Sequence, residues 1–570
     1  MIGVLCVLAV VLPALLALSA GSFSLPSIDD WAYRRVAETF AQSATLRFSG
    51  YVAMTLIGQV LWSWPFLRLL GGGAWGFAAS TAVLAVVGIA SAYYIGRSIL
   101  SRVWAAGAVL VLILAPGFAG NTSTFMTDVP TTSCELVCVA LGLAAIRRRG
   151  RSRAGLLAAS LAAGVFGFAV REFAVVAPLS VLFCAAIGAE RRDRAKYLLA
   201  GLVELLVCAA IYLWWLRQPG GVHQPLLLPS TITLVRLVQG YFTLAFMVSP
   251  AVAAVLWRRR RAPVAPRAAL SAVLVLLLGL AADANAGSVF VGDFLARRGA
   301  VGTLLLDGSR PALFPQALWD LISVVGLVAG ATLAGLALGG DRDRVREWRT
   351  WDWAGPLGLV RIFVIFFGAG SVVYLLATTF LWDRYLWPLA FFVVLLLLGG
   401  GPRGVPARRW AKRVGRGVAA LLWVLLGLVA ASVTLNTDAY DAGRWRAGEL
   451  AVARGVPARE VDAGFEWVGA HSRTIANLAL DPRVPGFEAW YARIQPGFRE
   501  CAVVSGSRLA SRALRPIGVA RYRLWSFAGP SEPLFVYRVA GCKAPPAVSA
   551  PATGAAGPRA TGMPREPERR

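Results

Sequence analysis

The sequence predicts an all-α polytopic transmembrane bundle of about thirteen spans, followed by a small α/β extracytoplasmic C-terminal domain. Apolar residues make up 57% of the 570-residue chain, and its mean hydropathy of +0.64 lies outside the range of soluble domains. Many apolar runs approach the roughly 20 residues that a helix needs to cross a bilayer. After residue 436, charged and aromatic residues return to ordinary proportions. These observations divide the chain into a membrane domain at 1–436, an extracytoplasmic domain at 437–543 and a disordered tail at 544–570.

The apolar runs define the spans. We expect them at 2–22, 76–96, 104–120, 129–146, 155–170, 173–189, 197–216, 240–257, 268–282, 316–339, 357–379, 385–400 and 418–436. The first run resembles a signal peptide but lacks a basic n-region, so we interpret it as a retained span. Gln59, Pro65 and Arg68 interrupt the run at 51–70, which its aromatic residues suit to the membrane interface.

Basic residues give the orientation. The net charge of +27 does not indicate nucleic-acid binding, because the Arg and Lys residues fall in short blocks between the apolar runs. With the spans above, every second loop is strongly basic, as cytoplasmic loops are. The N-terminus is then cytoplasmic and the C-terminus is extracytoplasmic. The same topology places five charged residues on the outer side: Asp29, Asp30, Asp128, Arg171 and Arg384.

The C-terminal domain contains a predicted hairpin. Two apolar, aromatic runs at 521–527 and 534–539 flank the sequence Ala528-Gly529-Pro530-Ser531, which is typical of a turn between strands. Cys501 and Cys542 lie in this polar region, where a disulfide would be stable outside the cytoplasm. Two unpaired thiols remain the alternative.

An acidic stretch follows the first span. Ser27 and Asp30 have the spacing of a capping box, so a helix is expected to start here with Asp29 and Asp30 in its first turn. Carboxylates at a membrane surface suit proton abstraction from a bound hydroxyl. Equally, both carboxylates could serve only to start the helix.

Two further polar sites lie on the same side. Asp128 precedes Pro130 at the head of the fourth span, where it is either an N-cap or part of a polar cavity. Arg171 and Glu172 form the whole of the third outer loop, either as a snorkelling pair at a helix end or as charges lining that cavity.

A dense aromatic and basic motif precedes the twelfth span. Arg384 lies beside Tyr385 in the sequence Trp382-Asp383-Arg384-Tyr385-Leu386-Trp387-Pro388. Its guanidinium could bind a lipid phosphate in a bidentate manner. An interfacial anchor of Trp, Tyr and Arg is the alternative.

Together these motifs resemble the GT-C superfamily of polytopic glycosyltransferases, in particular the protein O-mannosyltransferases and the bacterial aminoarabinose transferases. The resemblance rests on Asp29-Asp30 with Tyr33, on Thr127-Asp128-Val129-Pro130, on Arg384-Tyr385-Leu386 with Pro388, and on the outer C-terminal domain. It implies Asp29 as the base, Asp128 as a second catalytic carboxylate and Arg384 at the phosphate of a polyprenyl-phosphate sugar. Two features depart from the aminoarabinose branch: Ala32 stands where an Arg follows the acidic pair, and no Lys-Pro-Pro element occurs between Gly50 and Pro65.

The expected function is therefore an inverting sugar transfer to an acceptor hydroxyl at the outer face of a bacterial plasma membrane. The acceptor is a protein, a lipid or a glycan. Further substrate-binding residues are expected at Asp30, Arg34, Arg35, Arg171, Glu172 and Tyr385. A divalent metal on Asp29, Asp128 or Glu172 is left open. The alternatives are a transporter or flippase for a lipid-linked or small anionic substrate, and an assembly scaffold.

Overall fold

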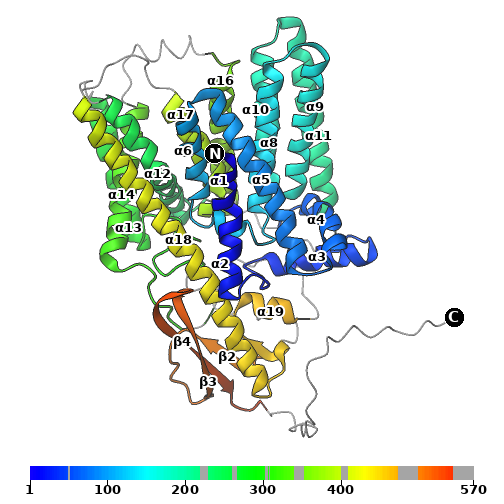
Figure 1. Cartoon of the computed structure of the whole chain (residues 1–570), viewed down its shortest axis with the longest axis vertical. Helices are drawn as coiled ribbons and strands as arrows, with labels where there is room; N and C mark the ends of the chain where they lie inside the picture. Colours follow the sequence, from blue (N-terminus) through cyan, green and yellow to red (C-terminus); the bar gives the residue numbers. More distant parts are fainter. Residues whose placement is uncertain are drawn as a thin grey trace, which may run out of the picture.

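The computed structural model describes residues 1–48, 52–218, 229–259, 266–301, 306, 308–338, 352–399, 409–472 and 499–542. The predicted tail at 544–570 lies outside these residues. Most of the described chain forms a helical bundle, with a small sheet beyond one end (Figure 1). The membrane part runs through α1 (Ile2–Cys6), η1 (Val7–Val11), α2 (Leu12–Ala20), α3 (Asp30–Ser43), α4 (Ile57–Leu70), α5 (Ala74–Ile99), α6 (Arg102–Ile113), α7 (Phe118–Asn121), α8 (Asp128–Ile146), α9 (Gly150–Val170), η2 (Glu172–Val175), α10 (Val176–Ile187), α11 (Arg191–Leu216), α12 (Thr231–Arg259), α13 (Pro266–Ala286), α14 (Gln316–Leu338), α16 (Pro356–Thr378), η3 (Asp383–Leu386), α17 (Trp387–Gly399) and α18 (Arg409–Ala453).

The membrane bundle confirms the predicted fold class. Each of the thirteen expected spans overlaps a helix or, at the N-terminus, the continuous helical run from α1 to α2, although the helix in the span expected at 104–120 ends at Ile113. Ten helices in the described part of the chain are long and apolar enough to cross a bilayer, and two shorter apolar helices cover Arg102–Ile113 and Glu172–Ile187. The chain is thus a multi-span membrane protein.

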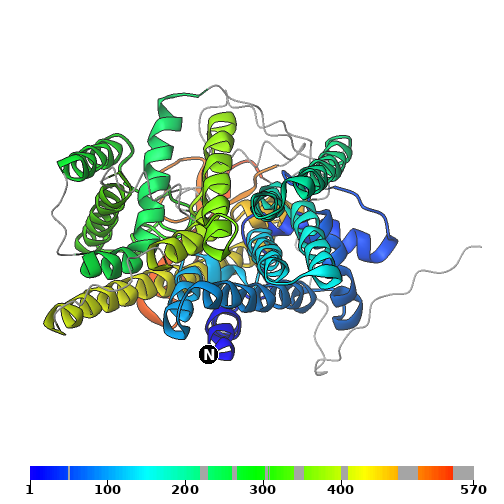
Figure 2. The ribbon, with the colours of Figure 1, turned by 90° about the horizontal axis from the view of Figure 1, so that it is seen from above.

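Burial differs between central and peripheral helices. In α8, which packs against α5, α9 and α10, 15 of the 19 residues are buried. By contrast, α11 and α13 leave Leu198, Leu202, Leu270 and Val273 exposed. Exposed apolar side chains on a helix whose own backbone hydrogen bonds are satisfied fit contact with lipid. Seen from above, α13 and α14 lie at one edge of the bundle and α9 and α11 toward another (Figure 2).

The short helices α3 and α4 lie at the end of the bundle that faces the sheet (Figure 1). The expected interfacial segment at 51–70 contains α4, which is 14 residues long and is not among the ten candidate spans. Its neighbour α3 contacts α19 (Phe465–His471) of the C-terminal part. The loops at this end of the bundle therefore lie between the membrane helices and the sheet.

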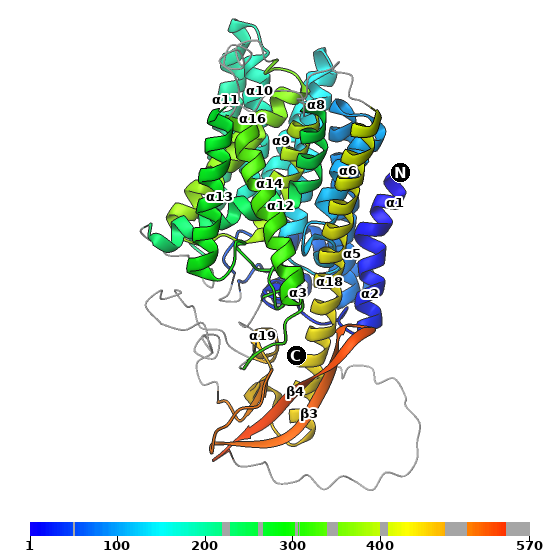
Figure 3. The same ribbon diagram turned by 90° about the vertical axis from the view of Figure 1, so that its left-hand side faces the viewer.

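The last membrane helix leads directly into the C-terminal part. Helix α18 is 45 residues long and continues past residue 436, the predicted domain boundary. It packs on the four-stranded sheet, whose order is β1-β2-β4-β3. Figure 3 shows this sheet beneath the bundle, with α18 descending to it. The strands are β1 (Val461–Asp462), β2 (Ala502–Ser505), β3 (Leu514–Trp525) and β4 (Ala528–Val539), and η4 (Ala458–Glu460) precedes β1.

The hairpin prediction was right in kind but wrong in position. Strands β3 and β4 pair antiparallel, and Trp525 pairs with Ala528, so the chain reverses at 526–527. Ser526 takes the positive φ of 41° that this tight reversal needs. Pro530 lies inside β4 because β2 pairs only with residues 535–538 of that strand. A proline is tolerated where one side of a strand lacks a ladder partner.

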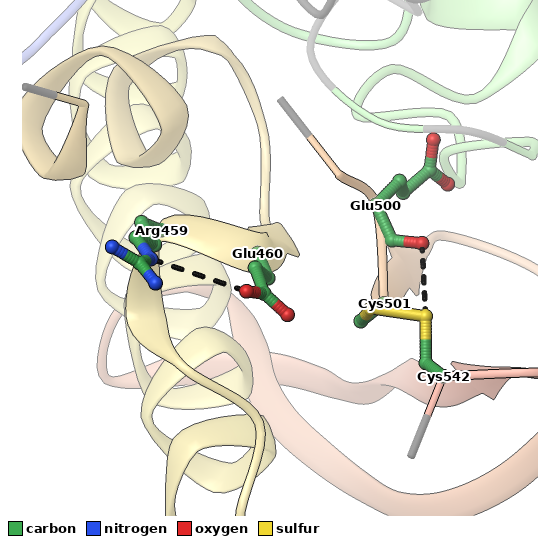
Figure 4. The surroundings of a disulfide bond; sticks show 5 residues. All are labelled: Arg459, Glu460, Glu500, Cys501 and Cys542. Carbon is green, nitrogen blue, oxygen red and sulfur yellow. Dashed lines mark hydrogen bonds and ion pairs between the residues drawn. A yellow bond between two sulfur atoms is a disulfide. The ribbon is translucent and has the colours of Figure 1, made fainter. Parts of the chain in front are cut away.

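A disulfide closes the C-terminal part. Cys501 and Cys542 are bonded, with Cα atoms 5.5 Å apart and a sequence separation of 41 residues (Figure 4). Cys501 lies just before β2, and its carbonyl accepts a hydrogen bond from the backbone N–H of Val539 in β4. The bond therefore fastens the end of β4 to the start of β2.

Candidate active site

The acidic stretch starts α3, as predicted, but Ser27 is not the N-cap residue that the capping-box spacing predicts. Asp29 is the N-cap residue, its side chain makes no capping hydrogen bond, and Asp30 is the first helical residue. The Asp30 carboxylate accepts hydrogen bonds from the backbone N–H groups of Ser27 (2.8 Å) and Phe125 (3.3 Å), and it pairs with Arg34 at 2.8 Å. Burial raises the pKa of Asp30 to about 6, although the Arg34 charge opposes that shift. Asp30 therefore connects the acidic loop to α3 and to the segment before α8. The partners of its carboxylate are residues of the protein itself.

Asp128 lies at the first residue of α8, beside the two arginines expected near it. Its Oδ1 lies 2.6 Å from Arg171 Nη1 and 3.5 Å from Arg384 Nε. Arg171 also donates to the hydroxyl of Tyr385 at 2.7 Å and to Thr127 Oγ1 at 3.2 Å. Three loops far apart in sequence thus meet at one buried carboxylate.

Arg384 has a second carboxylate partner, Asp293, which the sequence motifs did not indicate. Arg384 Nη1 and Asp293 Oδ2 are 2.9 Å apart. Burial raises the pKa of Asp293 to about 6, and the Arg384 charge opposes this shift. Neighbouring Asp383 accepts hydrogen bonds from the N–H groups of Phe294 (2.9 Å) and Leu295 (2.6 Å). These bonds hold the 293–295 segment against η3, so Arg384 is fixed between two loops.

Asp29 borders this cluster without joining an ion pair. Its Oδ2 accepts a 3.4 Å hydrogen bond from the Tyr33 hydroxyl one turn along α3. No Arg or Lys in the described part of the chain comes within 4.0 Å of its oxygens. Burial raises the pKa of Asp29, while the positive charges of Arg384 and Arg171 lower it. A carboxylate without an ion-pair partner, beside carboxylates already paired with arginine, remains able to accept a proton.

The backbone before Asp29 is strained. Ile28 has a φ of 54°, which is uncommon for a β-branched residue. Its N–H donates to Glu466 Oε1 of α19 at 3.1 Å. Glu466 in turn pairs with Arg444 of α18 at 2.7 Å. The surrounding structure therefore fixes an unfavourable backbone conformation next to the candidate base.

Arg34 and Arg35 both turn toward protein partners. Besides its ion pair, Arg34 donates to the carbonyls of residues 24 and 25. Arg35 donates to the carbonyls of Gly469 (2.9 Å) and Ser472 (3.0 Å) at the end of α19. The two arginines thus hold the acidic loop between the first span and the C-terminal part.

Glu172, which follows Arg171 in the sequence, also has a protein partner. Its Oε1 accepts the N–H of Thr55 at 2.8 Å, which connects η2 to the start of α4. Among the described residues, no group of three or more His, Cys, Asp or Glu side chains has an arrangement that could hold a metal ion. Asp128, another of the three candidate carboxylates for a metal, is paired with arginine.

Besides Asp293, one arginine near the site was not predicted from the sequence. Arg236, in the second turn of α12, lies over the rings of Phe380 and Trp382, at 5.7 and 5.6 Å. Its buried Nη1 has no hydrogen-bond partner within the described residues. The aromatic pair immediately precedes Asp383 and Arg384, and α12 packs against η3. The available signal was a lone Arg near the outer end of a predicted span, beside the outer loop.

Residues 60–215 match the model of the family described as dolichyl-phosphate-mannose-protein mannosyltransferase. That family is part of a superfamily of polytopic glycosyltransferases. The chain is similar to that family over these residues. No curated protein matches the chain in sequence.

Two solved structures resemble the chain at low identity. ArnT from Cupriavidus metallidurans bound to undecaprenyl phosphate is 16% identical, with 94% of this chain and 98% of that chain covered and a TM-score of 0.39. The archaeal oligosaccharyltransferase AglB from Archaeoglobus fulgidus, in complex with an inhibitory peptide and a dolichol-phosphate, is 14% identical. The match covers 77% of this chain and 58% of the AglB chain, with a TM-score of 0.37. Likenesses this distant assign no role to individual residues.

Proposed function

We propose that the chain is a GT-C glycosyltransferase, which moves a sugar from a polyprenyl-phosphate donor to an acceptor hydroxyl at the outer face of the plasma membrane. The observation that carries this proposal is the environment of Asp29. Asp29 borders the cluster and forms no ion pair in the described structure, whereas Asp128 and Asp293 are paired with arginines. The outer location is supported by the alternation of basic loops in the sequence.

The proposed reaction is a single displacement. Asp29 accepts the proton of the acceptor hydroxyl while the hydroxyl oxygen bonds to the anomeric carbon of the sugar. The bond between that carbon and the phosphate oxygen breaks, and the lipid phosphate leaves with the electron pair. Attack from the face opposite the leaving group inverts the anomeric centre. The other members of the cluster hold this geometry: Arg171 fixes Asp128, and Asp293 fixes Arg384.

The leaving phosphate needs cationic contacts, and Arg236 supports that role alongside Arg384. The charge of Arg384 is already shared with two carboxylates. The buried Nη1 of Arg236 has no hydrogen-bond partner among the described residues, and a guanidinium can bind phosphate in a bidentate manner. We propose that the phosphate contacts Arg236 and approaches Arg384 from the same side. The lipid tail would then leave toward the bilayer along α12.

The test combines donor identity with chemistry. Lipids that copurify with the full-length protein in mild detergent are identified by mass spectrometry, and a polyprenyl phosphate or its sugar ester is expected. Reconstituted protein given a labelled polyprenyl-phosphate sugar should release unlabelled polyprenyl phosphate as labelled acceptor forms. Movement of intact labelled donor across the bilayer without cleavage would instead identify a flippase and overturn the proposal.

A further inference from the structure

The turn of the β3–β4 hairpin is hydrogen-bonded to α18. The Ser526 hydroxyl donates to the backbone carbonyl of Leu435 at 2.8 Å. At the next position of α18, the side-chain N–H of Asn436 donates to the carbonyl of Leu524, also at 2.8 Å. We call residues 523–528 the hairpin tip. These two hydrogen bonds fix the position of the hairpin tip along α18.

The first span shows where that position lies relative to the membrane. Helix α2 ends at Ala20, and the hydroxyl of Ser22 donates to Oδ1 of Asp438 on α18 at 2.9 Å. Leu435 comes one turn before Asp438, about 4.5 Å nearer the membrane along α18. Figures 1 and 3 both show the turn of the hairpin at the height of the end of α2. The hairpin tip therefore lies at the membrane surface, although it belongs to the C-terminal part.

The hairpin tip presents an aromatic side chain at this surface. Phe527 is 65% exposed, and Trp525 beside it is half-buried. Another aromatic pair lies at the same level, where the rings of Phe23 and Trp75 have centroids 4.6 Å apart and Trp75 is 60% exposed. Aromatic side chains are enriched at membrane–water interfaces. A ring as exposed as that of Phe527 gains more from this layer than from water.

Arg523 adds a positive charge to the hairpin tip. Its side chain is exposed, and its Nη1 donates to the carbonyl of Phe527 at 3.1 Å, so the guanidinium lies beside the turn. Within the described residues, no carboxylate oxygen comes within 4.0 Å of its nitrogens. A guanidinium carries five N–H donors, so the hydrogen bond to Phe527 leaves Arg523 able to bind a phosphate group.

Arg521 lies on the same face of β3 but farther from the membrane. Its carbonyl accepts a hydrogen bond from Arg446 of α18 at 3.3 Å. Arg446 follows Leu435 by about three turns of helix, or about 16 Å along α18. The headgroup layer on each side of a bilayer is only about 5–8 Å thick. Of these two exposed arginines, Arg523 is therefore the one placed at the level of the lipid phosphates.

We propose that the hairpin tip docks on the phospholipid layer at this membrane surface. Phe527 lies at the boundary between headgroups and acyl chains, and Arg523 binds a lipid phosphate. The backbone of the tip stays among the headgroups, because hydrocarbon offers its polar groups no hydrogen bonds. The bilayer then holds the C-terminal part at a second point besides α18. This docking rests on the position of the membrane and does not depend on the sugar transfer proposed above.

The test measures the depth of a fluorescent label in the full-length protein, reconstituted in phospholipid nanodiscs. Phe527→Cys carries an NBD label, and Arg512→Cys, exposed at the other end of the hairpin, is the control position. Wild type treated with the same reagent gives the background from the other cysteines. Nitroxide-bearing lipid should quench the label at position 527 and aqueous iodide should not. The label at position 512 should show the opposite pattern.

Arginine variants test the phosphate contact. In the protein labelled at position 527, Arg523→Gln should shift the equilibrium from lipid-buried toward water-exposed label by about tenfold or more, the scale of a charged hydrogen bond. Arg521→Gln removes the same charge beyond the headgroup layer and should leave the quenching unchanged. Melting temperatures of all variants are compared, so that lost docking is distinguished from unfolding. Equal effects of the two variants would overturn the assignment of Arg523 to a lipid phosphate.

A label-free measurement tests the native side chain. Phe527→Ser should speed hydrogen exchange at the backbone amides of the hairpin tip and leave those of β2 unchanged, whereas equal exchange at the tip in both proteins would contradict the docking. Iodide quenching as strong at position 527 as at position 512 would place the tip in water and overturn the proposal. Shielding of the label from both quenchers would mean that a protein surface covers Phe527, which would also overturn it.

Discussion

The backbone N–H of Ile28 donates a 3.1 Å hydrogen bond to Oε1 of Glu466, so a side chain from the C-terminal part holds the residue before Asp29. This contact joins positions 438 residues apart. The other oxygen of Glu466 pairs with Arg444 at 2.7 Å. The C-terminal part is therefore built into the candidate active site.

We expect Glu466→Ala to lower the transfer rate more than its effect on stability explains. The change leaves the Ile28 N–H without its acceptor and releases the strained loop that presents Asp29. Breaking a buried ion pair costs about 3–5 kcal/mol, so the melting temperature should also fall. Asp441→Ala is the matched control, because Asp441 pairs with the same Arg444, whereas the Ile28 N–H donates to Glu466. Equal losses of rate in the two variants, at similar melting temperatures, would reduce Glu466 to a structural role.

The pH dependence of transfer should report the pKa of Asp29. A base acts in its deprotonated form, so the rate falls as the pH drops through that pKa. Burial raises the pKa of Asp29 and the Arg384 charge lowers it. The acidic limb of kcat/KM should therefore lie above the ordinary aspartate value of 3.8, and Arg384→Gln should move it to still higher pH. Arg34→Gln, which removes the charge paired with Asp30, should leave the limb in place. A limb that Arg384→Gln moves downward would contradict this electrostatic picture.

Arg236→Gln should weaken donor binding through loss of the phosphate contact. Because a charged hydrogen bond contributes about 1.5–3 kcal/mol, the Kd for a polyprenyl phosphate should rise by about tenfold or more. Arg236→Lys should restore only part of the affinity, since a point charge cannot form the bidentate contact. Binding is measured by displacement of a fluorescent lipid phosphate. Unchanged affinity would leave Arg236 as an aromatic-stacked anchor of α12.

Loss of the Cys501–Cys542 bond should destabilise the C-terminal part. Closing a loop of 41 residues contributes about 4 kcal/mol in the chain-entropy description. The variant with both residues changed to Ser should melt at a lower temperature, and the wild type should shift by a similar amount under reducing conditions. A wild type insensitive to reductant would indicate that the two thiols are not bonded in solution.

Much of the fold could be predicted because the length of an apolar run and the charge of the loop beside it depend only on residues that are neighbours in the sequence. The long runs became helices, and the outer-side placement of Asp128, Arg171 and Arg384 agrees with their meeting in one cluster. Asp293 and Glu466 could not be found in this way, since each depends on a contact between segments far apart in sequence. The hairpin turn was misplaced because Gly529 and Pro530 are residues typical of turns. In the structure β4 already pairs with β3 at Ala528, so the turn lies before these two residues. Arg34 and Arg35 were expected at a substrate, yet both contact the protein itself.

The most direct measurement is single-turnover transfer from a labelled polyprenyl-phosphate sugar by wild type, Asp29→Asn and Asp30→Asn. Asn keeps the size of the side chain but cannot accept the proton, so Asp29→Asn should lower the rate by about 10² or more while donor binding stays nearly constant. Asp30→Asn, which disturbs the contacts to Ser27, Phe125 and Arg34, should lower the melting temperature and affect the rate far less. Full activity of Asp29→Asn in a folded protein would contradict the assignment of Asp29 as the base.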